Sequence, residues 1–261
     1  MLELKKNGYR SWQWVASGKH PSVKDYISIG RMFPLAASFS EWLSKGYTEQ
    51  KIKSGSKRTY CSWRFWVKGP AQGEISCGLL RDSSDSIGRP YPLLIMGIGS
   101  LEGWEKKWEI VPLACEDTWS QMERISVQPY AGVDLLEQKL SSLPGPLSDW
   151  LSSREARYQD LDEYDLISQA DRELFCSQVR DLSEKIMGYI VLDPSDDHDR
   201  INDIEFVGSV LKQYLENAPS AVFIGGSVGI SCFAFFRRPL TVSDFSTLWS
   251  GVPHRQKMDT I

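Results

Sequence analysis

The alternation of apolar and polar residues is clearest between residues 60 and 98, where it predicts an antiparallel meander. One face of the stretch 60–68 carries apolar side chains and the other carries polar ones, and only Trp66 breaks the rule. Residues 74–80 and 91–98 also have the composition of strands, and a glycine- and proline-containing turn separates the first two stretches. Short connections of this kind join antiparallel neighbours, so we predict three adjacent strands here.

The remaining segments mix helical and strand patterns. Apolar residues recur at helical spacing in 33–52, 111–125, 133–143, 168–186 and 203–216, and a short helix is expected at 244–249. Strands are expected at 9–16, 221–224 and 230–236, and the last two flank a glycine-rich turn. The fold class that follows is α/β (α+β), with a largely antiparallel sheet flanked by helices on both sides and a helical C-terminal half closed by a β-hairpin.

Domain organisation follows from the absence of repeats and of low-complexity linkers. We expect one compact domain over residues 1–252, with its second part, about 126–252, made of helices and the hairpin. The acidic stretch 152–170 is only weakly periodic and is expected to be a surface excursion, and residues 253–261 are expected to form a flexible tail.

Composition and charge narrow the class of protein. The chain has 261 residues, 41% of them hydrophobic and 25% charged, which are ordinary globular values. No stretch has the ~20 apolar residues of a membrane helix, the N-terminus lacks the apolar core of a signal peptide, and the five cysteines are scattered. We therefore expect a cytoplasmic protein with reduced thiols and without membrane insertion.

The net charge of −4 conceals a basic N-terminal segment, residues 1–60, and an acidic segment, residues 154–205. Two interpretations stay open: the segments form solvated faces that attract each other within one fold, or one of them steers a partner of opposite charge. Nucleic acid is not an expected partner, because the basic segment has no nucleic-acid-binding motif and the molecule as a whole is acidic.

Several motifs suggest chemistry that their context does not support. Gly225-Gly226-Ser227-Val228-Gly229 matches the nucleophile elbow of hydrolases, but a strand pattern rather than a helix follows the serine, so a hairpin turn is expected. The three histidines are far apart, the cysteines are scattered, and there is no phosphate-binding loop of the Walker type. We predict neither a metal site nor a cofactor.

The most concentrated polar cluster runs from Asp82 to Arg89, directly before an apolar strand. Three interpretations of this cluster stay open. It forms a structural turn, in which the aspartates accept hydrogen bonds from backbone N–H groups and Gly88 supplies a positive φ; it is a partner-binding surface; or it is a catalytic site. In the catalytic reading Asp85 is a base or metal ligand, Ser83 or Ser84 a nucleophile and Arg89 an anion clamp. No histidine lies nearby in the sequence to orient such a set, although His20 could lie near in space.

Trp66 poses a separate question, because it falls on the polar face of its strand beside Arg64 and Lys68. It is either covered by another element of the fold or exposed as the anchor of an interface, since tryptophan and arginine are typical hot-spot residues.

Two segments together resemble the TagF/ImpM family, which is associated with type VI secretion. Gly18-Lys19-His20-Pro21-Ser22-Val23-Lys24-Asp25-Tyr26 is similar to the opening G-K-x-P-S-x-x-D-[FY] of that family. Residues 83–93 resemble its second signature, S-x-D-x-x-G-R-x-[FY]-P-L, through Ser83, Asp85, Gly88, Arg89 and Pro92. Order and spacing agree over about residues 9–125. Residues 223–227 and 245–251 resemble the closing hairpin and F-x-x-L-W-x-G end of the family more weakly.

The resemblance implies a non-enzymatic cytoplasmic repressor of the secretion apparatus that acts after translation by binding a forkhead-associated scaffold protein. It provides no catalytic residues. The residues we select as candidates for binding are Lys19, Asp25, Trp66, Ser83, Asp85, Gly88 and Arg89. From charge alone, Lys19–Asp85 or Asp25–Arg89 pairs are expected to tie the two loops together. The alternatives are a hydrolase or phosphatase-like enzyme that uses Asp82, Asp85 and Arg89, or a structural subunit of the apparatus.

Overall fold

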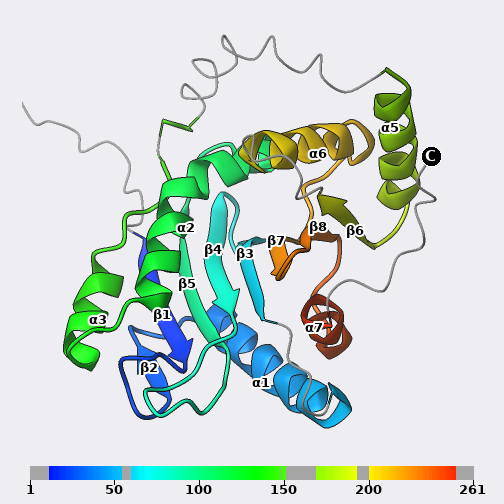
Figure 1. Cartoon of the computed structure of the whole chain (residues 1–261). Helices are drawn as coiled ribbons and strands as arrows, with labels where there is room; N and C mark the ends of the chain where they lie inside the picture. The colour runs from blue at the N-terminus through cyan, green and yellow to red at the C-terminus, as the bar shows by residue number, and fades with distance from the viewer. Residues whose placement is uncertain (1–11, 55–59, 148, 151–168, 193–199, 251–261) are drawn as a thin grey trace, which may run out of the picture.

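One open sheet of eight strands forms the centre of the protein (Figure 1). The computed structural model describes residues 12–54, 60–147, 149–150, 169–192 and 200–250. The strands lie in the order β2-β1-β5-β4-β3-β7-β8-β6, and every neighbouring pair is antiparallel. Their bounds are β1 Gln13–Gly18, β2 Ile27–Ile29, β3 Cys61–Lys68, β4 Glu74–Arg81, β5 Leu93–Ser100, β6 Met187–Leu192, β7 Ala221–Ser227 and β8 Ser231–Phe236.

The predicted meander β3–β4–β5 forms the middle of this sheet. Alternate residues of β3 face opposite cores, because successive side chains of a strand point to opposite faces. Trp63 and Phe65 enter one core, whereas Trp66 enters the other. The hairpin β7–β8 continues the sheet on the far side of β3, and the β7 residue Phe223 pairs with Phe65.

Helices cover both faces of the sheet, as the sequence predicts. Helices α1 (Pro34–Ser54) and α7 (Val242–Trp249) pack on one face through residues such as Trp42 and Phe245. A side chain at Gly46 in α1 would collide with Phe245, so glycine at this position permits the close approach of the two helices. A capping box between Thr241 and Asp244 starts α7.

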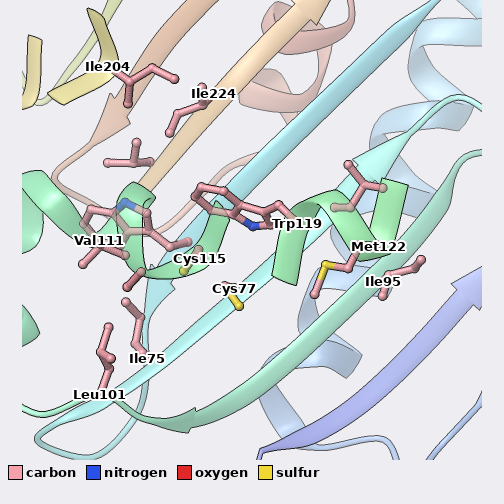
Figure 2. Packing of buried hydrophobic residues seen from close by; sticks show 14 of the residues in the cluster. Ile75, Cys77, Ile95, Leu101, Val111, Cys115, Trp119, Met122, Ile204 and Ile224 are labelled. Carbon is pink, nitrogen blue, oxygen red and sulfur yellow. The ribbon is translucent and has the colours of Figure 1, made fainter. Parts of the chain in front are cut away.

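The other face is covered by α2 (Val111–Val127), α3 (Val133–Ser141), α5 (Gln169–Ser183) and α6 (Arg200–Tyr214). Two short 3₁₀ segments, Trp104–Lys106 and Trp108–Ile110, lead from β5 into α2. Figure 2 shows Cys115 of α2 near Cys77 of β4, and Met122 of α2 beside Ile95 of β5. The buried side chains between these helices and the sheet form the larger of the two hydrophobic cores.

Most predicted elements are confirmed, and the differences have physical causes. Strand β2 is missing from the prediction because three residues are too few for a periodic signal. The helix expected over 168–186 ends at Ser183, and Ile186 is exposed immediately before β6, a strand that the prediction also lacks. The glycine-rich segment 225–229 lies in the β7–β8 hairpin and not in a nucleophile elbow.

Several expectations lie outside the described residues: the first residues of the strand expected at 9–16, most of the acidic excursion at 152–170, and the tail 253–261. Within the described residues, each helix is too short or too polar to span a bilayer. The described cysteines are free thiols, and all except the half-buried Cys176 are buried.

Candidate functional site

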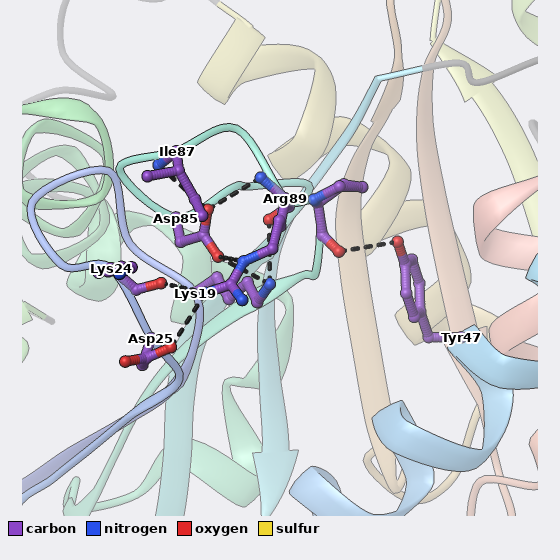
Figure 3. A network of polar contacts seen from close by, with 8 residues as sticks. Lys19, Lys24, Asp25, Tyr47, Asp85, Ile87 and Arg89 are labelled. Atoms are coloured by element: carbon purple, nitrogen blue, oxygen red, sulfur yellow. Dashed lines mark hydrogen bonds and ion pairs between the residues drawn. The ribbon is translucent and has the colours of Figure 1, made fainter.

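The two sequence signatures lie next to each other at one end of the sheet. The β1–β2 loop carries residues 19–26, and the β4–β5 loop carries residues 82–92. Antiparallel pairing places Gly18, at the end of β1, opposite Leu93, at the start of β5, so both loops leave the sheet at the same end. The Ser86 amide also donates a 2.9 Å hydrogen bond to the Val23 carbonyl, which joins the loops directly. Figure 3 shows the resulting polar network.

The carboxylate of Asp85 is the centre of this network, and its side chain is completely shielded from solvent. Oδ2 accepts a hydrogen bond from Lys19 Nζ at 2.9 Å and another from Arg89 Nε at 2.7 Å. Oδ1 accepts from the backbone amides of Ile87 at 3.2 Å and Arg89 at 2.9 Å. A carboxylate has about four acceptor positions, so these four donors saturate it.

Electrostatics keep Asp85 ionised. Burial by itself raises the pKa of this carboxyl group, but the hydrogen bonds from Lys19 and from the side chain and backbone of Arg89 outweigh burial, so that its pKa lies well below the usual range. The ammonium and guanidinium groups thus compensate a buried negative charge that would otherwise be costly. Of the two, Lys19 joins the β1–β2 loop to the β4–β5 loop, whereas the Arg89–Asp85 pair lies within the β4–β5 loop.

Arg89 extends the network to the surface. Its Nη2 donates to Asp25 Oδ1 at 3.0 Å and to the backbone carbonyl of Lys24. The Arg89 and Asp25 side chains are 49% and 79% exposed, so this second ion pair is a surface contact of small energetic value. The structure therefore contains both of the ion pairs expected from charge, Lys19–Asp85 and Asp25–Arg89.

Two further signature residues contribute through their backbone. Gly88 has a φ of 82°, which favours glycine, and its amide donates to the Asp85 carbonyl at 2.9 Å. The Ser83 carbonyl accepts a 3.0 Å hydrogen bond from the Tyr91 amide and so closes the base of the loop. Together with the bridge between Ser84 and Pro90, these bonds make the β4–β5 connection a compact turn.

A second set of contacts, which no sequence pattern indicates, anchors the β1–β2 loop to helix α2 and to the segment that follows it. His20 is completely buried; its Nε2 donates to the Ile125 carbonyl at 2.8 Å, and its Nδ1 accepts from the Ser22 amide at 3.1 Å. Ser22 Oγ in turn accepts from the Tyr130 amide at 2.6 Å. Burial lowers the pKa of His20, so the imidazole is neutral at pH 7. Partners more than 100 residues away in the chain leave no local signal.

Trp66 requires a correction, because it is not an exposed anchor. Its side chain is 1% exposed and packs between Trp104, at a centroid distance of 5.5 Å, and Trp108, at 6.3 Å. The 3₁₀ segments that precede α2 cover this face of β3. Its polar neighbour Arg64 is covered as well, and binds Glu123 and Glu116 of α2 at 2.7 Å each. Trp66 is therefore a core residue and leaves the set of candidate binding residues.

The geometry disfavours the catalytic reading of the cluster. Asp85 has no acceptor position left for a substrate proton or a metal ion. Asp82 accepts hydrogen bonds from the Cys61 amide at 3.0 Å and from Trp249 Nε1 at 3.1 Å, so it ties β3 and α7 to the loop. Among the described residues, no three histidine, cysteine or acidic side chains gather in a way that suits a metal ion. The arrangement builds two rigid loops that display exposed side chains between them.

Comparison with known proteins matches this chain to one family model and to solved structures. Residues 16–143 match the family model described as the TagF N-terminal domain, type VI secretion system-associated. The crystal structure of PA0076 from Pseudomonas aeruginosa PAO1 is similar, with a TM-score of 0.53 and 15% sequence identity, over 95% of this chain and 98% of that chain. At this identity the second match supports the fold alone. No curated protein matches the sequence.

Proposed function

The chain belongs to the TagF family, associated with type VI secretion, through residues 16–143, and we propose on this basis that it is a non-enzymatic regulatory adaptor of that system. It represses secretion after translation, in the cytoplasm, by binding a forkhead-associated scaffold protein of the apparatus. The protein acts by occupying its partner and not by a chemical step.

The saturated Asp85 carboxylate is the observation that supports an adaptor over an enzyme. The acidic group with the most suitable position for catalysis receives four hydrogen bonds from its own loops. General bases and metal ligands need an acceptor position directed at the substrate or the ion. The two loops are instead held in one conformation, which lowers the entropic cost of binding another protein.

Binding of the purified chain to the purified forkhead-associated scaffold of the same secretion system tests the partner. Isothermal titration calorimetry should give a saturable isotherm with a defined stoichiometry. An isotherm without binding heat at two temperatures would contradict the proposal, because burial of apolar surface makes the binding enthalpy depend on temperature.

Secretion measured in cells tests the direction of regulation. Overproduction of the chain should lower the amount of secreted substrate protein while the cellular abundance of the apparatus components stays constant. Lower abundance of those components would indicate control of synthesis instead, and unchanged secretion would contradict repression. The enzyme alternative is tested by incubating the purified chain with generic hydrolase and phosphatase substrates, with and without divalent metal ions; turnover by the chain would contradict the adaptor proposal.

A further inference from the structure

Large apolar side chains are exposed at the end of the sheet that carries the two signature loops. Tyr26 is 49% exposed in the β1–β2 loop, and Ile87 is 57% exposed in the β4–β5 loop. The start of β3 and the β7–β8 turn reach the same end, because Cys61 pairs with Ser227, and there Tyr60 and Val228 are 43% and 78% exposed. Exposed apolar side chains that gather at one end of a sheet are typical of an interaction surface.

At this end of the sheet, the two signature loops expose charged side chains as well as apolar ones. We call Lys24, Tyr26, Ile87 and Arg89 the loop patch. Hydrogen bonds link three of its members: the Arg89 guanidinium donates to the Lys24 carbonyl, and the amides of Ile87 and Arg89 donate to the same carboxylate oxygen of Asp85 (Figure 3). Tyr26 lies two residues after Lys24 in the same loop. Tyrosine and arginine are enriched among the residues that dominate binding energy at protein interfaces.

The loop patch is held rigidly from beneath. Asp85 fixes Arg89 through its side chain and its amide, and Tyr26 packs edge-on against Tyr91 with ring centroids 5.6 Å apart. Tyr91 also packs against Tyr47 of α1 at 5.1 Å. Side chains that are already ordered lose little conformational freedom when a partner binds, so more of the contact energy contributes to affinity.

Charge determines which kind of partner fits. Asp25 and Asp85 are both neutralised by Arg89, and Asp85 also by Lys19. The exposed ammonium of Lys24 makes no ion pair with the described part of the chain, which leaves positive charge on the loop patch. A partner surface that places a carboxylate beside apolar side chains complements this arrangement.

We propose that the loop patch is the surface through which this chain binds its protein partner, and that the partner presents acidic and apolar side chains to it. This inference rests on the proposed function, because it assigns a place to the scaffold contact. It gives the two signatures a joint role: the buried Asp85 and the half-buried Lys19 form the support, and the exposed residues form the contact.

Paired charge and polarity changes test the assignment. The patch variant is Lys24→Glu/Ile87→Asp, and the matched control is Lys185→Glu/Ile186→Asp. Ile186 is 61% exposed, compared with 57% for Ile87, and lies at the opposite end of the sheet, next to the start of β6. Because all four side chains are exposed, both variants should retain the wild-type unfolding temperature. Binding to the purified scaffold is measured by surface plasmon resonance.

We expect the patch variant to bind at least ~30-fold more weakly, which corresponds to two interface residues that each contribute about 1 kcal/mol, while the control binds within ~2-fold of the wild type. The single variant Lys24→Glu should mainly slow association and should weaken its dependence on salt. Hydrogen exchange of the complex should show protection at residues 24–26 and 86–89.

Three outcomes would overturn the assignment. If the wild type and the patch variant bind equally, the loop patch is not the interface, although the proposed function stands. If the patch and control variants lose affinity equally, the effect is one of overall charge and the assignment is wrong. If the wild type does not bind the scaffold at all, the proposed partner is wrong and the assignment of this surface falls with it.

Discussion

Replacing His20 by phenylalanine tests whether the β1–β2 loop is anchored to helix α2. The change keeps a planar ring in a site that is completely buried, but it removes the donor to Ile125 and the acceptor for Ser22. The Ile125 carbonyl of α2 and the Ser22 amide of the loop then lack this partner. A buried polar group left without its hydrogen bond costs about 1–3 kcal/mol. Because the Ser22 amide is only part-buried, it lies at the lower end of this range, and the expected loss in the free energy of unfolding is about 2–4 kcal/mol.

Urea denaturation followed by tryptophan fluorescence measures this loss. The midpoint should fall while the slope m stays constant, because the variant buries the same surface as the wild type. Native proteins typically have unfolding free energies of about 5–15 kcal/mol, so the variant should remain folded and its unfolding can be compared with that of the wild type. A difference below about 0.5 kcal/mol would refute the reasoning, since it would mean that neither hydrogen bond contributes to the anchoring.

The pH dependence of the same experiment provides an independent check. Burial lowers the pKa of His20 in the folded state below its value of 6.5 in the unfolded chain, although the bond to Ile125 acts in the opposite direction. The unfolded state therefore binds the proton first. The stabilising contribution of the neutral imidazole is present above pH 6.5 and is lost as the pH falls toward the folded-state pKa, by at most about 1.4 kcal/mol per pH unit. The phenylalanine variant should show a flatter profile between pH 7.5 and 5, and an unchanged slope would contradict the account.

Three further predictions concern the loops and the core. Trp66→Ala should lower the free energy of unfolding by about 3–5 kcal/mol in urea titrations, because a buried tryptophan leaves a cavity, and a loss below 1 kcal/mol would mean that the residue is not packed as described. Gly88→Ala should lower the free energy of unfolding by only about 1 kcal/mol, because the added methyl group meets open space at a φ of 82°. Gly18→Ala should lower it clearly more, because its methyl group collides with the Pro92 carbonyl. Equal losses for the two variants would contradict this close approach of the backbones. Asp85→Asn should lower the thermal midpoint of unfolding at pH 7 and make that midpoint less sensitive to acid below about pH 4. The lowered pKa of this aspartate stabilises the fold above that pH, and the contribution is lost as the carboxylate protonates. An unchanged midpoint at pH 7 would show that the charge of Asp85 is not needed.

Local pattern was sufficient to predict the meander and the contacts between the signatures. Strand β3 shows its alternation directly, and the opposite charges of the two signatures are enough to suggest a Lys19–Asp85 or an Asp25–Arg89 pair. Edge strands were not predictable in this way. Strand β2 has only three residues and forms because β1 offers a free edge, and β6 follows a helix whose spacing extends to the exposed Ile186.

Tertiary packing decided the positions that sequence reasoning could not. Trp66 and Arg64 lie on a strand face that the pattern marks as polar, yet α2 and the segments before it cover that face and supply carboxylates to Arg64. The β1–β2 loop is anchored by hydrogen bonds from His20 to the Ile125 carbonyl and from the Tyr130 amide to Ser22, and both partners are distant in the chain and take part through their backbone groups. Backbone groups are common to all residues, so contacts of this kind have no signature in side-chain sequence.

The affinity of the purified chain for the purified forkhead-associated scaffold, measured for the patch variant and for the control variant in parallel, tests the central claim most directly. The account predicts tight binding by the wild type and by Lys185→Glu/Ile186→Asp, and binding at least ~30-fold weaker by Lys24→Glu/Ile87→Asp. Equal affinity of all three proteins would contradict the assignment of the surface, and no binding by any of them would contradict the function itself.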